Sequence, residues 1–392
     1  MDKSAVCGRK GCMGVMCKNI IERIREKRRK QMLFWTFLLA AAAACLLFPG
    51  RESFAASRLA APQGLLANGV REEIVLSWEP VRGADGYEVY EKQAGTKRWT
   101  LVQKTGGKKT LLTGRQAGSR FCYRVRAYKE KKNGTVRYGS FSKKADTTLP
   151  KRAVTTLRNF LKTAIAPVGS TMYIWGGGWN KADTGAGRDA LRIGLNPQWR
   201  EFAGRQSASY DYRRYRYRRG YGLDCSGFVG WSVYNVLHTS KGSPGEGYVD
   251  KAASLAKEYA GNGWGSFRRA SDVREYKSGD IMSGPGHVYI VLGECADGSV
   301  VFVHSSPAGV QIGGTASPAG RTDSRAVKLA EKYMKKQAPS WYRRFPDVAR
   351  GSSYLRYSQF RWDVRGGSVM EDPDGYQERS AKAVLKDLFA AK

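Results

Sequence analysis

A cysteine at the start of an apolar helix is the residue of this chain best suited to nucleophilic chemistry. Cys225 directly follows Asp224, which is expected to act as the N-cap. Cys225 then lies in the first turn, where unpaired N–H groups and the helix dipole favour a thiolate over a thiol. The helix is predicted from apolar residues at helical spacing, namely Val229, Val233, Val236 and Leu237. The competing interpretation is a buried, inert cysteine that begins a core helix.

Two of the three histidines, His287 and His304, fall on one expected β-hairpin downstream of this cysteine. Residues 287–292 and 299–304 have the composition of strands, and residues 295–298 supply a turn that ends in Asp-Gly. A thiol, a base and a group that orients the base are the minimum parts of a cysteine hydrolase. The hairpin therefore predicts where the base and its orienter lie.

The length of the turn decides whether the two imidazoles meet. With a four-residue loop, Glu294 faces Ser299 and His304 faces Tyr289, so both histidines share one face within side-chain reach. A two-residue loop keeps that arrangement, whereas a three- or five-residue loop breaks it. The remaining histidine, His238, is expected at the end of the cysteine helix, close to its last carbonyl groups.

At this point the chain resembles the NlpC family of papain-like peptidoglycan peptidases. A leading helix is expected near residues 154–166, and the match extends over roughly half of the chain. The resemblance is carried by five short segments: Tyr173–Gly177 (YIWGG), Asp224–Phe228 (DCSGF), Gly279–Ile281 (GDI), Gly286–Val288 (GHV) and Val303–His304.

The resemblance implies an α+β papain-like cysteine peptidase domain and a role for each matching residue. Cys225 would be the nucleophile, His287 the general base that later protonates the leaving amine, and His304 the residue that orients His287. Tyr173 would stand beside the nucleophile and help stabilise the oxyanion. Two further substrate-binding residues are implied, which would help to hold the free amine of the substrate: Asp224 and Ser226.

The family cleaves amide bonds in the stem peptides of bacterial cell walls, often between D-γ-glutamate and a diamino acid. The expected function is therefore that of a secreted peptidoglycan endopeptidase that uses no metal and no cofactor. Two alternatives stay open: an N-acetylmuramoyl-L-alanine amidase of the cysteine–histidine class, and a catalytically silent cell-wall-binding protein.

One stretch departs from the family pattern. Residues 179–222 form a long insertion where a short connection is usual, and residues 210–219 alternate tyrosine with arginine. A basic aromatic wall for an anionic glycan or peptide and a solvated charged loop are equally supported. The pattern also suits single-stranded nucleic acid, but export makes that partner unexpected.

The N-terminal part predicts export. Residues 1–31 form a basic cytosolic segment, and residues 32–55 a signal peptide or membrane anchor with an apolar run at residues 32–48. A cleaved signal is favoured over a retained anchor. The protein is expected to be bacterial and secreted or cell-wall associated, contacting the membrane only through this segment. The net charge of +33 favours peptidoglycan and anionic cell-wall polymers as partners, without nucleic acid.

The exported part divides into two domains. Residues 58–149 contain strand-length apolar segments separated by turns, which predict an all-β fibronectin type III-like sandwich with Trp78 in its core. We expect it to serve as a spacer or in adhesion. Residues 150–392 form the predicted peptidase domain, whose C-terminal extension, residues 321–392, contains two expected helices and one strand. An odd number of exported cysteines argues against a disulfide scaffold.

Overall fold

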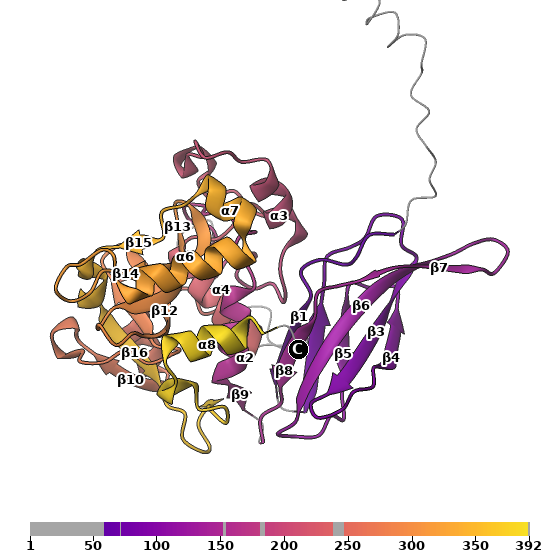
Figure 1. Ribbon diagram of the computed structural model, residues 1–392, viewed down its shortest axis with the longest axis horizontal. Helices are drawn as coiled ribbons and strands as arrows, with labels where there is room; N and C mark the ends of the chain where they lie inside the picture. Colours follow the sequence, from indigo (N-terminus) through magenta and orange to yellow (C-terminus); the bar gives the residue numbers. More distant parts are fainter. Residues whose placement is uncertain (1–58, 71, 152–153, 181–184, 238–246, 391–392) are drawn as a thin grey trace, which may run out of the picture. The chain divides into compact units, whose positions relative to one another are not determined.

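The computed structural model describes residues 59–70, 72–151, 154–180, 185–237 and 247–390 (Figure 1). From Arg58 onward the chain forms one compact unit. The expected cytosolic segment, the signal or anchor at residues 32–55, and His238 lie outside the described residues. Within the described ranges, no helix has the length and apolar character needed to cross a bilayer.

The first described region is a sandwich of two antiparallel sheets. The smaller sheet has the order β1 (Leu66–Val70), β2 (Glu73–Ser77) and β5 (Lys109–Leu112). The larger sheet contains β4 (Thr100–Thr105), β3 (Gly86–Gln93), β6 (Arg120–Glu130), β7 (Val136–Phe141) and β8 (Ala145–Thr148), and β7 and β8 both pair with β6.

Alternate residues of β6 build the interior of this sandwich. Phe121, Tyr123, Val125 and Ala127 are buried in one cluster with Trp78, as the strict alternation of the strand requires. Three strands face four if β7 and β8 count as one interrupted strand, which is the arrangement of a fibronectin type III domain. The sandwich and its core tryptophan are as predicted from the sequence.

The second region is organised around a seven-stranded sheet. Its strands follow the order β10 (Gly265–Arg268), β16 (Ser358–Trp362), β11 (Ile281–Gly284), β12 (His287–Glu294), β13 (Val300–Ser306), β14 (Gly309–Thr315) and β15 (Ala349–Arg350). All neighbours are antiparallel except β14 and β15. A separate two-stranded sheet pairs β9 (Thr155–Thr156) with β17 (Met370–Glu371).

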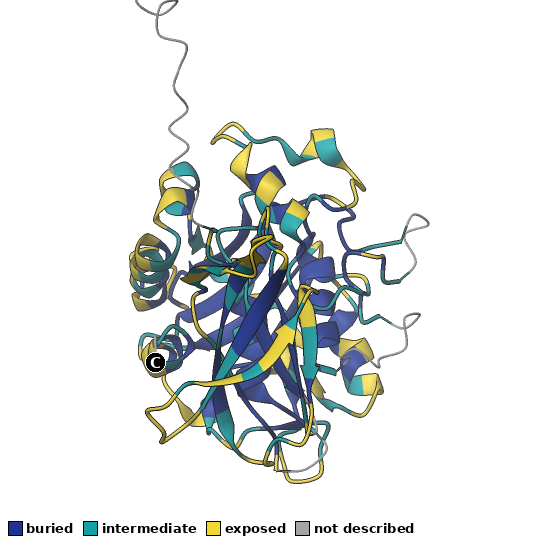
Figure 2. Ribbon diagram, turned by 90° about the vertical axis from the view of Figure 1, so that its right-hand side faces the viewer, coloured by how far each residue is buried: buried dark blue, intermediate teal, exposed yellow. Residues whose placement is uncertain are grey.

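The α-helices of this region are α2 (Leu157–Ile165), α3 (Pro197–Gly204), α4 (Cys225–Leu237), α5 (Leu255–Gly261), α6 (Arg325–Gln337), α7 (Pro339–Arg344) and α8 (Ala381–Leu388). The main core fills one face of the seven-stranded sheet, where Val288 and Ile290 of β12 meet Phe228 of α4. Tyr289 and Val291 point to the other face, into a smaller cluster. Buried residues, drawn in dark blue in Figure 2, make up these interiors.

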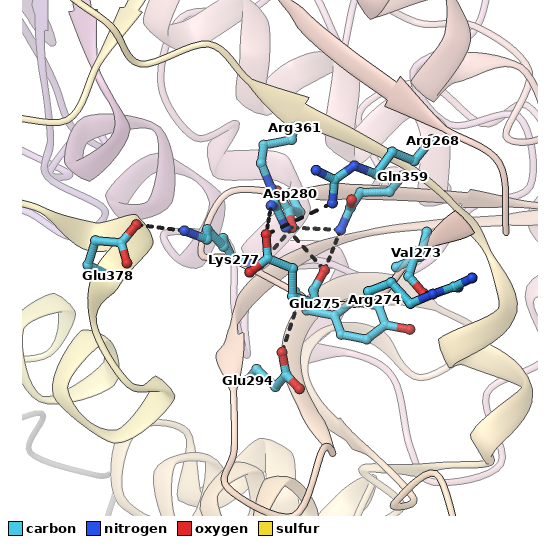
Figure 3. Close-up of polar contacts among 11 residues, drawn as sticks. Arg268, Val273, Arg274, Glu275, Lys277, Asp280, Glu294, Gln359, Arg361 and Glu378 are labelled. Carbon is cyan, nitrogen blue, oxygen red and sulfur yellow. Dashed lines mark hydrogen bonds and ion pairs between the residues drawn. The ribbon is translucent and has the colours of Figure 1, made fainter. Parts of the chain in front are cut away.

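The segment expected as a C-terminal extension belongs to this sheet. Its strand β16 lies between β10 and β11, next to the strand that leads to His287. Asp280 fixes the junction: its fully buried carboxylate accepts hydrogen bonds from Arg361 Nε (2.9 Å) and Gln359 Nε2 (2.9 Å) (Figure 3). Burial raises the pKa of Asp280, and the Arg361 guanidinium opposes that rise.

Buried polar contacts connect the sandwich to the helix that follows it. The Asn159 amide of α2 donates to Gly69 O (3.1 Å) and Thr148 O (2.8 Å), and its Oδ1 accepts from Thr148 N (3.1 Å). The buried Arg158 forms ion pairs with Asp146 of β8 and with Asp387 of α8. The sandwich is therefore attached by buried side chains as well as by its linker, which is more than a simple spacer needs.

Candidate functional site

The nucleophile candidate begins α4, as its local sequence predicts. Asp224 Oδ1 accepts the Gly227 N–H (2.6 Å) and the Ser226 hydroxyl (3.0 Å), and the Asp224 carbonyl accepts the Phe228 N–H (2.9 Å). Asp224 is therefore the N-cap of the helix. Cys225 occupies the first turn with a free thiol and is 5% exposed.

A close approach of glycines brings the Tyr173–Gly177 segment to the cysteine across the long insertion. Asp224 N–H donates to Gly177 O (2.8 Å). A Cβ on Gly227 would stand 2.0 Å from that same carbonyl oxygen, so only glycine fits there. Gly227 lowers the helix propensity of this segment, but the neighbouring backbone needs the space that a side chain would fill.

The two strands of the hairpin bring the histidines to the same face as predicted, but the turn between the strands is shorter than predicted. Cys295 N–H donates to Ser299 O (2.8 Å), so the turn closes over three residues, 296–298, instead of four. Such a loop alone would put the two histidines on opposite faces. A bulge between Val291 and Gly293 shifts the register by one residue, after which Ile290 pairs with Val303. Continuing that register places Tyr289 opposite His304, as predicted.

The register shift occurs next to Gly293, a position that only glycine can occupy. Its φ is +145°, a conformation that L side chains rarely adopt. An added Cβ would also lie 2.7 Å from Ala381 Cα, at the start of α8. The histidine register is therefore set jointly by the turn and by the packing of a distant helix.

The two imidazoles are in direct contact. His287 Nε2 and His304 Nδ1 are 2.9 Å apart, and their rings meet edge to face at 5.0 Å between centroids. The Cys225 thiol donates to Gly286 O (3.9 Å), the carbonyl directly before His287, and the Val288 N–H donates to the sulfur. Because Nε2 of His287 is engaged by His304, any proton that this ring accepts from the thiol would have to go to Nδ1.

The ionisation state of Cys225 in the free protein differs from the thiolate that its place at the start of a helix predicts. Burial, reinforced by the Asp224 carboxylate, raises the pKa of the Cys225 thiol to about 12, although backbone N–H groups oppose the rise. Burial and then Arg350 lower the pKa of His287 to about 3, and burial lowers that of His304 well below its ordinary value. Desolvation thus outweighs the helix terminus, and the resting pair is a neutral thiol and a neutral imidazole.

The three residues expected to bind substrate all lie beside Cys225. Tyr173 is 7% exposed, and burial, then Cys225 and Asp224, raise the pKa of its hydroxyl, which keeps it a neutral donor. Ser226 donates to Asp224 and accepts from Trp179 Nε1 (2.9 Å). Asp224 and Ser226 are buried and engaged with protein groups, so their evident task in the free protein is to hold the first turn.

Three further residues, which the sequence did not indicate, lie close to the histidine pair or to the strand before it. Tyr354 lies 5.4 Å from His287 between ring centroids, and Tyr357 packs against Gly284. Arg350 donates to Ser306 Oγ (3.4 Å) and lowers the pKa of both histidines. All three lie in residues 350–357, which begin at the end of the edge strand β15. Their sequence gives no indication that they lie close to the histidines.

Most aromatic residues of the insertion pack against one another, whereas Tyr217 and most of its arginines are exposed. Phe202 of α3 stacks on Tyr221 (4.3 Å between centroids) and meets Tyr215 edge to face (5.0 Å). The Tyr210 hydroxyl donates to Tyr173 O (2.6 Å), which connects the insertion to the site. All five arginines of residues 210–219 are exposed: Arg213, Arg214, Arg216, Arg218 and Arg219. Their exposure is compatible with both interpretations of the insertion, and a wall for an anionic ligand stays a prediction.

An aromatic patch, Trp175 with Tyr217, lies on the surface of this region. The two side chains are 45% and 44% exposed, and the Tyr217 N–H donates to Trp175 O (2.7 Å). Tyr217 has φ +53°, the one positive value at a non-glycine position in the described ranges. Next to it a cavity of about 460 Å³ is lined by Gly176–Gly178, Trp179, Arg218 and Arg219, among others.

A metal centre is not formed by the described residues: they contain no group of three or more His, Cys, Asp or Glu side chains able to hold an ion.

Comparison with known proteins finds relatives of the sandwich fold. No family model and no curated protein matches the chain. The FN3tt crystal structure is 18% identical and covers 24% of this chain and 98% of its own, with a TM-score of 0.21. A Fn3-like protein from Clostridium thermocellum is 26% identical over 24% of this chain and 97% of its own (TM-score 0.21). The fn3 domain of human collagen alpha-1(XX) is 22% identical, covering 25% and 92% (TM-score 0.20).

These three structures each cover about a quarter of this chain, and the second region is interpreted from its own residues and their geometry.

Proposed function

We propose that residues 150–392 form a papain-like cysteine peptidase domain of the NlpC type, which hydrolyses amide bonds in peptidoglycan stem peptides. The observation that carries this proposal is the 2.9 Å contact between His287 Nε2 and His304 Nδ1, at the strand whose preceding carbonyl contacts the Cys225 thiol. We assign Cys225 as the nucleophile, His287 as the base and His304 as the orienting group; α4, which carries the cysteine, is distant in sequence from the β12–β13 hairpin, which carries both histidines.

The chemistry follows from the neutral resting state. Cys225 transfers its proton to His287 Nδ1 as its sulfur attacks the substrate carbonyl, and backbone N–H groups near the sulfur stabilise the oxyanion together with Tyr173. His287 then returns that proton to the leaving amine, and a thioester remains on Cys225. Water, deprotonated by His287, attacks the thioester; the acid leaves and the thiol is restored.

The surface that adjoins the Tyr173–Gly177 segment agrees with a cell-wall substrate. The Trp175–Tyr217 patch offers flat apolar faces suited to sugar rings, and the Arg216 guanidinium lies 5.8 Å from the Trp175 ring centroid. The exposed Arg218 and Arg219 line the adjoining cavity and suit carboxylate or phosphate groups of the wall. We further propose a location outside the cell or at the wall, with an amide between D-γ-glutamate and a diamino acid as the target.

A test of the surface uses the change of Arg216, Arg218 and Arg219 to glutamine. Binding to insoluble peptidoglycan is expected to weaken and to lose much of its salt dependence, because exposed charges act over about one Debye length, roughly 8 Å at physiological salt. The matched control changes three exposed lysines of α6, Lys328, Lys332 and Lys335, to glutamine. Equal losses in both variants would assign the effect to overall charge and not to this surface.

The enzyme itself is tested by mass spectrometry of purified peptidoglycan digested with residues 58–392, which form one compact unit. New stem-peptide fragments are expected from the wild type and not from Cys225→Ala, and their masses identify the bond. Release of intact stem peptides would identify an N-acetylmuramoyl-L-alanine amidase instead.

The histidine variants sharpen this test. His287→Ala is expected to be nearly as inactive as Cys225→Ala, while His304→Ala retains more activity, since an orienting group is partly replaceable by water. Equal activity in Cys225→Ala and wild type would reject the mechanism. Binding to the wall without fragments from any form would favour the silent cell-wall-binding protein, an alternative that agrees with the 5% exposure of Cys225.

A further inference from the structure

Two buried polar atoms stand on directly opposed residues behind the histidine pair. His304 of β13 pairs with Gln311 of β14, and both residues are fully buried. Among the described residues, neither His304 Nε2 nor Gln311 Oε1 has a hydrogen-bond partner. Such atoms are costly to leave unpaired, and two of them on one cross-strand pair call for a common explanation.

The orientation of the glutamine amide is fixed by its other end. Gln311 Nε2 donates to the Asp347 carbonyl (2.9 Å), so the oxygen is the atom that remains to accept a hydrogen bond. Side chains directly opposed on antiparallel strands have Cβ atoms about 4.5–5.5 Å apart and share one face of the sheet. In the described geometry the Gln311 oxygen and His304 Nε2 make no direct hydrogen bond, so a small rotation of the Gln311 side chain or one bridging water would join them.

The positions of the protons on the two histidines make His304 Nε2 a donor and leave Gln311 Oε1 as an acceptor. If His287 Nδ1 is to accept the thiol proton, its own proton must sit on Nε2 and be donated to His304 Nδ1 (2.9 Å). His304 must then carry its proton on Nε2. That N–H is a donor in need of an acceptor, and Gln311 Oε1 is an acceptor in need of a donor.

We infer that Gln311 is a positioning residue of the proposed peptidase: its Oε1 accepts the His304 Nε2 proton and so fixes the tautomers of His304 and His287. This inference rests on the proposed function for its catalytic meaning. The arrangement extends the series Cys225, His287 and His304 by a fourth member. Its neutral amide holds the tautomer without adding charge behind the pair.

The charge environment explains why an amide suits this place. The ionisable groups that the structure places against the histidine pair are Arg350 of β15 and Tyr354 of the following turn. The Asp347 carboxylate pairs with Arg350 (3.2 Å) but is 79% exposed and shifts the pKa of neither histidine, whereas Arg350 disfavours an imidazolium. A carboxylate at position 311 would stabilise the imidazolium and raise the pKa of the pair, whereas an apolar side chain would release the tautomer.

The test is long-range ¹H–¹⁵N NMR of histidine-labelled residues 58–392, with signals assigned from the His287→Ala and His304→Ala variants. In the wild type we expect the Nε2–H tautomer for both residues. Gln311→Met should produce a mixture of tautomers and lower kcat about tenfold or more at unchanged KM, because a wrong tautomer disables the base. Gln311→Glu should raise the pKa of the pair by more than one unit.

A matched control separates this effect from general damage. Gln359→Met removes another buried glutamine amide from β16, which β11 and β12 separate from β13. It should leave the histidine tautomers as in the wild type. Unchanged tautomers in Gln311→Met would overturn the inference. If that variant does not fold, an unchanged histidine pKa in Gln311→Glu would overturn it instead.

The outcome is independent of the proposed function. Tautomers that respond to Gln311 in a protein that cleaves no peptidoglycan would support the positioning role and reject the enzyme. Cleavage by the wild type, with tautomers indifferent to Gln311, would support the enzyme and reject the positioning role.

Discussion

Removing the charge next to the nucleophile should make Cys225 more reactive at neutral pH. Asp224→Asn keeps a side-chain oxygen to cap the helix, where asparagine performs as well as aspartate, but it removes the negative charge that opposes the thiolate. In the wild type the thiol pKa is about 12 against an ordinary value of 9.0. That difference of three units lowers the thiolate population at pH 7 about a thousandfold, to roughly one molecule in 10⁵.

Burial contributes most to this shift, and Asp224 comes second. We expect Asp224→Asn to lower the thiol pKa by about one unit, and so to speed alkylation about tenfold at pH 7. Because the raised pKa keeps the thiol protonated, the logarithm of the wild-type rate should rise with unit slope from pH 6 to 10. His287, whose pKa is lowered to about 3, contributes no imidazolium in that range.

The assay is iodoacetamide labelling of residues 58–392 at a series of pH values, followed by peptide-level mass spectrometry that distinguishes each cysteine. Cys295 serves as an internal control, because burial and Asp297 raise its thiol pKa to about 11 and Asp224→Asn should leave its rate unchanged. A Cys225 rate that stays high and level between pH 5 and 8 would refute the reasoning. It would mean that a preformed thiolate–imidazolium pair exists and that the helix terminus outweighs burial.

Two further changes test the packing around the site. Gly227→Ala would place a Cβ 2.0 Å from Gly177 O; we expect a loss of about 1–3 kcal/mol in the free energy of unfolding by urea, and of activity. A stable, active Gly227→Ala protein would contradict the close approach. Arg361→Met leaves the buried Asp280 charge uncompensated and should cost about 3–5 kcal/mol in the same measurement. The control Arg365→Met removes a guanidinium that is 87% exposed and should cost little; similar losses in both would argue against the buried network.

Much of the local structure follows from the sequence because it depends on residues close together in the chain. The cap at Asp224, the helix that begins at Cys225 and the alternation of β6 each arise from neighbouring residues, and the structure contains all three. The pairing of His287 with His304 is also as expected, although the loop length on which that expectation depended was wrong. A bulge at Gly293 compensates for the loop.

Tertiary structure decided the properties that depend on distant segments and on solvent. Gly293 is held in its conformation against the start of α8, and Arg350 and Tyr354 reach the histidines from a segment for which the sequence predicted only two helices and a strand. The same holds for the ionisation of Cys225. A helix N-terminus, readable from the sequence, favours the thiolate, but the desolvation that raises its pKa exists only once the surrounding chain has packed over the sulfur.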